Sequence, residues 1–178
     1  MKEPQNYILD FEVDKLTNSI ENVSTGEKFD TSIMQLSFDV NAKEIKKSDW
    51  VFNWKKELQI PERRIFKLTT LENNKIIHGL LSLEDKNDHT FMYLLESAKF
   101  NKGKDKIYFG VPANLVAFAC KISFEKGYEG FVSFDAKTAL IEHYKKSLGA
   151  THFRGLKMFI ETQAAKILVK QYFKDFKI

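Results

Sequence analysis

The clearest pattern of apolar and polar positions lies between residues 91 and 150, where strand and helix signals alternate. Residues 91–97 are an aromatic and aliphatic run, short enough for a strand that is buried on both faces. Residues 113–126 place apolar side chains on one side at helical spacing, and Gly127 follows as the expected left-handed cap. Residues 130–135 are a second short apolar run. Two strands joined through a helix predict a parallel pair.

The next helix is expected to begin at Thr138, an N-cap residue type, and to end at Leu148, before Gly149. Residues 156–161 predict a later strand, and a final helix is expected from about Gln163. These elements extend the alternation of strands and helices toward the end of the chain.

The region before residue 91 carries a different pattern. Residues 63–70 and 75–83 predict two antiparallel strands joined through a hairpin turn at residues 72–74, and they would precede the strand at 91–97 as a meander. Residues 1–40 are irregular and predict no strong element.

A helix is predicted over residues 42–58, with Trp50 and Trp54 one turn apart and with Val51 and Leu58 nearby on the same face. Such a tryptophan pair is usually part of a core. The alternative is an aromatic wall that contacts a bound substrate.

The loop at residues 98–109 is rich in lysine and leads into Gly110 and Pro112. Gly110 permits a tight backbone path, and Pro112 suits the first turn of a helix. The unpaired amides and the dipole at a helix N-terminus stabilise an anion, so this turn is a candidate phosphate site. The alternative is a solvated surface turn. The lysines that would add to the attraction are Lys102, Lys104 and Lys106.

This order of elements resembles the GNAT superfamily of acyl-CoA-dependent N-acyltransferases. The fingerprint of that family is a strand, a Gln/Arg-x-x-Gly-x-Gly/Ala turn, a helix, a strand, and a helix that ends in Tyr-x-x-x-Leu-Gly. Here the two motifs are Ile-Tyr-Phe-Gly-Val-Pro at 107–112 and Tyr-Lys-Lys-Ser-Leu-Gly at 144–149, the latter with one residue inserted relative to the commonest form. Ile107 stands where Gln or Arg is usual, and Pro112, which has no amide hydrogen, stands where a small residue is usual.

The resemblance implies an α/β fold of the GNAT type. Its central sheet is mixed and mainly antiparallel, with a parallel, splayed strand pair and helices on both faces, and this chain adds an extra C-terminal helix. We expect a single acyltransferase domain over residues 1–178, in which 1–60 are less typical, 61–162 form the core and 163–178 form the added helix.

The resemblance also implies the function, which is transfer of an acetyl group from acetyl-CoA, the co-substrate, to a primary amine by direct attack. The pantetheine arm would lie between the splayed strands. Glu96 would be the base and Tyr144 the acid that protonates the departing thiolate, while Lys137 corresponds to an asparagine of many relatives. The residues expected to bind the co-substrate are Ser97, Ala98, Lys104, Lys106, Tyr108, Phe109, Gly110, Val111, Ala113 and Lys137.

Each assignment has an alternative. Glu96 could be an ion-pair partner of Lys99 or Lys137 in water, and Tyr144 could be a core residue with its hydroxyl satisfied at the rim. The protein as a whole could be a catalytically degenerate module of this fold that binds CoA or another protein. A toxin-like acetyltransferase acting on aminoacyl-tRNA is a further alternative, suggested by a pI of about 9.0.

Composition adds limits. The net charge of +4 arises from 28 basic and 24 acidic residues that are interleaved, so a nucleic-acid partner is not expected. Cys120 is the lone cysteine and lies in an apolar helix, which predicts a buried inert thiol. The four histidines are scattered, so no metal is expected. Without a signal peptide at Met1–Asn6 or an apolar run of about 18 residues, we expect a cytoplasmic protein with no membrane partner, and a homodimer is an option.

Overall fold

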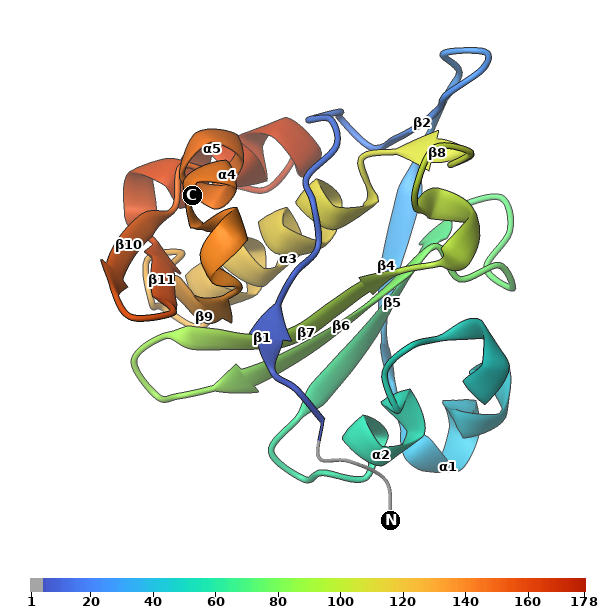
Figure 1. The fold of residues 1–178 in the computed structure, drawn as a ribbon, viewed down its shortest axis with the longest axis horizontal. Coiled ribbons are helices and arrows are strands. Elements are labelled where there is room, and N and C mark those ends of the chain that lie inside the picture. Colours follow the sequence, from blue (N-terminus) through green and yellow to red (C-terminus); the bar gives the residue numbers. More distant parts are fainter. Residues whose placement is uncertain (1–4) are drawn as a thin grey trace.

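The main sheet has the strand order β10-β11-β9-β7-β6-β5-β4, and the computed structural model describes residues 5–178 (Figure 1). Strands β4 to β7 form an antiparallel meander, β7 and β9 are parallel, and β11 runs antiparallel to both β9 and β10. This confirms the mixed, mainly antiparallel sheet with a parallel pair. The strands are β4 (Thr31–Leu36), β5 (Arg64–Thr70), β6 (Gly79–Asp85), β7 (Thr90–Ser97), β9 (Val132–Ala136), β10 (Thr151–Arg154) and β11 (Lys157–Ile160).

Strand β4 was not predicted, because residues 1–40 showed no strong pattern. Strands β5, β6 and β7 agree with the sequence prediction except at the start of β6. The expected strand began at residue 75, whereas β6 begins at Gly79. The register explains the difference, since Leu68 of β5 already pairs with Gly79 and residues 71–78 are needed to turn the chain.

Helices cover both faces of this sheet. Side chains alternate along each strand, so two separate clusters form, one on each face. On one face Ile65, Leu80 and Leu94 pack with Trp50 and Trp54. On the other face, helices α3 (Val111–Glu125) and α5 (Thr162–Tyr172) contribute to a larger cluster with Phe66, Leu81 and Leu95.

The expected helices of the second half of the chain are present, but the last one ends at Tyr172 instead of extending to residue 178. Helix α3 begins at Val111 and is followed by Gly127 at φ +82°, and α5 packs against α3, so the added helix covers the domain itself. Helix α4 (Ile141–Leu148) ends at Gly149 with φ +68°. It is preceded by a 3₁₀ turn, η4 (Thr138–Leu140), so Thr138 is not the N-cap of α4.

The parallel pair diverges, and the chain fills the gap with its own backbone. The register between β7 and β9 covers Thr90–Phe91 and Val132–Ser133. Further along, β1 (Ile8–Leu9) pairs in parallel with Asp135 and Ala136 of β9. Figure 1 shows β1, in dark blue, between β7 and β9. The splayed arrangement is therefore observed, with a segment of the protein inside it.

The predicted helix over residues 42–58 is wrong. That region contains α1 (Phe38–Asn41), the 3₁₀ turns η1 (Ala42–Glu44) and η2 (Lys47–Asp49), and α2 (Trp54–Leu58). A helix fails to form because the amides of Val51 and Phe52 donate to the Glu96 carboxylate instead of to backbone carbonyls. Trp50 and Trp54 are both buried, which confirms the core interpretation, whereas Val51 is exposed.

A second, small sheet was not predicted. Strand β2 (Ile20–Asn22) pairs with β3 (Lys28–Phe29) and with β8 (Tyr108–Phe109), which lies in the lysine-rich loop beside η3 (Lys99–Asn101). Strands of two or three residues are too short for a periodic signal. The small sheet holds residues 20–29 beside the start of α3, as Figure 1 shows.

No helix among residues 5–178 is long and apolar enough to cross a membrane. Within the same part of the chain, no group of His, Cys, Asp and Glu side chains has the arrangement of a metal site. The start of the chain, on which the expectation of no signal peptide partly rests, lies outside the described residues.

Candidate active site

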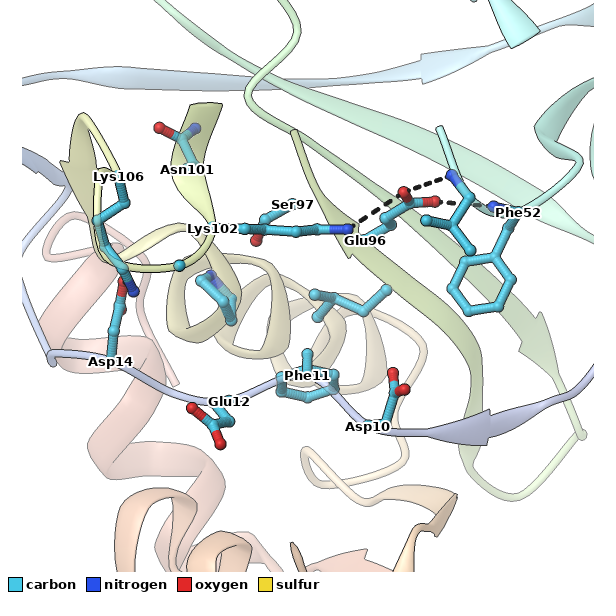
Figure 2. A pocket seen from close by; sticks show the side chains of 14 residues that line it. Asp10, Phe11, Glu12, Asp14, Phe52, Glu96, Ser97, Asn101, Lys102 and Lys106 are labelled. Atoms are coloured by element: carbon cyan, nitrogen blue, oxygen red, sulfur yellow. Dashed lines mark hydrogen bonds and ion pairs between the residues drawn. The ribbon is translucent and has the colours of Figure 1, made fainter. Parts of the chain in front are cut away.

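A cavity of about 400 Å³ lies where β7 ends beside the start of α3. One wall comes from residues 8–17, which we call the cleft segment; the other comes from β7 and the lysine-rich loop (Figure 2). The lining residues are Asp10, Phe11, Glu12, Asp14, Val51, Phe52, Leu95, Glu96, Ser97, Asn101, Lys102, Gly103, Lys106 and Pro112.

The glycine turn at the start of α3 binds a carboxylate. The Gly110 amide donates to one oxygen of Asp14 at 3.1 Å, and the Lys106 ammonium contacts the other at 3.0 Å. Gly110 is the N-cap of α3 with φ +94°, and a Cβ there would collide with Thr17 and with the Ser19 carbonyl at 2.7 Å. Glycine is therefore required by both the backbone angle and the close packing. The turn holds an anionic side chain of the protein itself, and its predicted role as a phosphate site stays a prediction.

Tyr144 contacts the cleft segment at Phe11. Its side chain is fully buried, and its hydroxyl donates to the Phe11 carbonyl at 2.6 Å. Burial raises the pKa of Tyr144, and the carboxylates of Asp10 and Glu12 shift it in the same direction. The phenol is thus a neutral hydrogen-bond donor at neutral pH, aimed at the backbone of the segment that fills the gap between β7 and β9.

Glu96 is buried at the end of β7 and accepts several hydrogen bonds. Its donors are the Val51 amide at 2.8 Å, the Phe52 amide at 3.1 Å and the Trp54 indole at 2.9 Å, and Lys102 lies 3.4 Å away. The ion pair is with Lys102 rather than with Lys99 or Lys137. Glu96 therefore anchors residues 51–54 to the sheet, and its role as a base stays a prediction.

The structure brings some of the other predicted residues together and separates others. Ser97 lines the cavity beside Glu96 and Lys106, whereas Ala98 lines a different cavity and Lys104 is exposed on the loop. The remaining predicted residues lie around the glycine turn and β9: Tyr108 and Phe109 in β8, Val111 and Ala113 buried in the first turn of α3, and Lys137, whose amide donates to the Leu9 carbonyl.

Asp14 and the rest of the cleft segment were missed. The segment lies almost 100 positions before Gly110 in sequence, so no local motif connects them. A signal existed, because Leu9, Phe11 and Val13 alternate with three acidic residues, as in a strand with one buried face. The structure bears out that alternation, since Leu9 and Val13 are buried while Asp10 is exposed.

Comparison with solved structures identifies the architecture. A mutant of the toxin AtaT, bound to the C-terminus of the antitoxin AtaR and to acetyl-CoA, superposes with a TM-score of 0.55 at 18% identity, over 78% of this chain and 98% of that chain. The chain has the GNAT fold. A second neighbour, described as a bacterial toxin, gives a TM-score of 0.56 at 13% identity, over 80% of this chain and 96% of that chain.

A third neighbour, from the KacTA–DNA complex, gives a TM-score of 0.51 at 13% identity over 78% of this chain and 97% of that chain. No protein-family model and no curated protein matches the sequence. Identities this low establish the fold alone, so the chemistry of the site has to be argued from its own residues.

Proposed function

We propose that the protein is an acyl-CoA-dependent N-acyltransferase that transfers an acetyl group to a primary amine. The observation that carries the proposal is the anion site at the start of α3, where Gly110 and Lys106 hold a carboxylate beside the open end of the β7–β9 pair. A carboxylate in this position is a stand-in for a phosphate oxygen, because both are stabilised by amide donors, an ammonium and the helix dipole. The turn therefore fits the pyrophosphate of CoA.

The residues of the cleft have matching roles. When bound, acetyl-CoA supplies an acetyl thioester. Tyr144, kept neutral by burial, holds a proton that the departing sulfur requires. A primary ammonium has a pKa of about 10.4 and must lose a proton before its nitrogen attacks the thioester. Glu96 is the proposed acceptor of that proton. Lys102 is the most distant of the four donors to Glu96. In the proposed complex, the substrate ammonium would occupy the position of the Lys102 ammonium.

A second candidate is a module of the same fold that binds CoA or a protein without turnover. Pro112 favours it, because the second residue of α3 offers no amide, and one missing donor to a charged acceptor weakens binding by about 1.5–3 kcal/mol. The engagement of Tyr144 with Phe11 also favours it. Turnover of the thioester with a panel of primary amines separates the two candidates. Two neighbours are described as toxins, but their names do not mention an acceptor, so a toxin-like action on aminoacyl-tRNA stays a prediction.

The test is a calorimetric titration of the protein with CoA, acetyl-CoA and pantetheine, which lacks the nucleotide and its phosphates. We expect CoA to bind at least about tenfold more tightly than pantetheine, because charged hydrogen bonds to phosphate are among the strong ones. Lys106→Gln should reduce that ratio severalfold, and the control Lys170→Gln, on the exposed side of α5, should leave it unchanged.

The ratio is the useful quantity, because Lys106→Gln also weakens the hold on Asp14 and would change the affinity for both ligands together. Gly110→Glu is a poorer variant, since any side chain at Gly110 collides with Thr17. Equal affinities for CoA and pantetheine, or no binding of either at millimolar concentration, would remove the proposal.

A further inference from the structure

We propose that the cleft segment, residues 8–17, is an internal competitor for the acyl-CoA site, so that the protein binds acyl-CoA only when this segment is released. The inference rests on the proposed function and adds a mode of regulation to the same site. It is carried by three sets of contacts. They are the pairing of β1 with β9, the hydrogen bonds of Phe11 and Asp14 with donors of the site, and the attachment of Thr17 to α5.

The first set places the segment as a strand in the gap of the sheet. Strand β1 lies in the register of β9, and the Lys137 amide donates to the Leu9 carbonyl at 2.9 Å. Leu9 is 2% exposed and belongs to the main core cluster. The Val13 amide donates to the His143 ring at 2.9 Å. The backbone of the segment therefore occupies the space between β7 and β9 in which an extended arm would lie.

The second set consists of contacts that a bound acyl-CoA would need for itself. The Asp14 carboxylate accepts from the Gly110 amide and pairs with the Lys106 ammonium, which are the donors proposed for the pyrophosphate. The Phe11 carbonyl accepts from the Tyr144 hydroxyl, which is the donor proposed for the sulfur. One donor cannot serve both partners in the same geometry, so the segment and the co-substrate exclude each other at both ends of the site.

Charge strengthens the exclusion. Asp10, Glu12 and Asp14 alternate along the segment and all line the cavity, as Figure 2 shows. Phosphate groups that approached the turn would meet these carboxylates, and like charges repel most strongly where water is partly excluded. While Asp14 neutralises Lys106, the turn also has less positive charge to offer to a ligand.

The third set anchors the far end of the segment to α5. The Thr17 amide donates to the Tyr172 hydroxyl at 2.8 Å, and Gln171 donates to the Thr17 carbonyl at 3.3 Å. Release therefore has to break a defined set of hydrogen bonds. The apparent affinity for the ligand is the intrinsic affinity reduced by the fraction of molecules in which the segment is open.

The experiment compares Asp14→Ala with Asp39→Ala in titrations with acetyl-CoA. Both variants remove one carboxylate, but Asp14 contacts Gly110 and Lys106, whereas Asp39 is exposed on α1 and does not line the cavity. We expect Asp14→Ala to bind acetyl-CoA at least about tenfold more tightly than the wild type, and Asp39→Ala to differ from it by less than about threefold. Equal affinities of Asp14→Ala and wild type would overturn the proposal.

Hydrogen exchange gives a second readout that does not depend on activity. The amides of Val13, Thr17 and Lys137 are bonded within or onto the segment. Saturating acetyl-CoA should speed their exchange in the wild type, because the ligand takes the place of the segment. Protection that persists in the complex would show that both fit together, and the proposal would fail.

Inorganic pyrophosphate separates failure of this inference from failure of the proposed function. If no variant binds acetyl-CoA but Asp14→Ala binds pyrophosphate more tightly than the wild type, the acyltransferase proposal falls and the competition stands. If acetyl-CoA binds the wild type and Asp14→Ala equally, the function stands and the competition falls. If Asp14→Ala binds neither probe, both fall.

Discussion

At the scale of single residues, the Tyr144 hydroxyl has two alternative partners, the Phe11 carbonyl in this structure and the departing sulfur in the proposed reaction. Its hydroxyl now holds the Phe11 carbonyl, and in the proposed reaction the same proton goes to the departing sulfur. Tyr144→Phe should therefore lower kcat by about 100-fold or more, because a general acid contributes at least that much, while KM for acetyl-CoA stays the same or falls as the cleft segment loosens. Steady-state kinetics with a fixed amine gives both constants. A binding module would show tighter acetyl-CoA binding in this variant and no turnover in either protein.

The candidate site was partly readable from single residues. Gly110, Tyr144 and Glu96 each follow a local pattern, namely a glycine before a helix, a Tyr-Leu-Gly helix end and the end of a buried strand, and the structure places all three around the gap between β7 and β9. Asp14 was not readable in this way. Its partners, Gly110 and Lys106, are more than 90 positions away, and only the three-dimensional fold brings them together.

At the scale of elements, the junction between α3, β9 and α5 depends on a glycine. Gly130 has φ +80°, and a Cβ there would lie 2.5 Å from the Phe124 ring and 2.7 Å from Ala165. Gly127 has φ +82° at the end of α3, with open space where its Cβ would be, as far as the described residues show. Gly127→Ala should lower the free energy of unfolding by about 1 kcal/mol through the backbone angle, and Gly130→Ala by about 3 kcal/mol or more through added overpacking.

Urea denaturation of the two glycine variants checks this difference. Similar losses of unfolding free energy in both variants would mean that the junction of α3, β9 and α5 accommodates an added methyl group. The junction would then not fix the position of β9. Since β9 carries the register for β1, a shifted β9 would also loosen the cleft segment.

The elements that sequence predicted are those with their own periodicity. Strands β5 to β7, α3, β9, α4 and α5 each bury one side or all sides over enough residues for a periodic pattern to appear in the sequence. The helix expected at 42–58 had such a pattern in Trp50 and Trp54. The Glu96 carboxylate, about 45 positions later, accepts hydrogen bonds from the amides that the helix would have used. Strands β1, β2, β3 and β8 are two or three residues long and depend on partners supplied by the rest of the fold.

At the scale of the whole molecule, His78 makes the free energy of unfolding depend on pH. It lies between β5 and β6, is almost fully buried, and packs edge-on against the rings of Phe100 and Tyr108 in the lysine-rich loop. Burial lowers its pKa to about 4, whereas the unfolded chain has the ordinary value near 6.5. Between these two values the unfolded state binds one proton more than the folded state. The free energy of unfolding therefore falls as the pH falls from about 6.5 to about 4, by about 3 kcal/mol over the whole window.

This loss can be separated from the titration of carboxylates. A hydrogen bond from Tyr128 lowers the pKa of Asp85, so its contribution is present above the unfolded pKa and is lost at lower pH than that of His78. Denaturant unfolding of His78→Gln at a series of pH values should give a lower stability at pH 7 but a nearly flat profile from pH 6.5 to pH 5.5, above the range in which Glu44 and Glu84, whose pKa values are also lowered, begin to lose their contributions. His152→Gln, an exposed site, should follow the wild-type profile. If His78→Gln keeps the wild-type slope, the buried imidazole is not the group that makes this fold acid-sensitive.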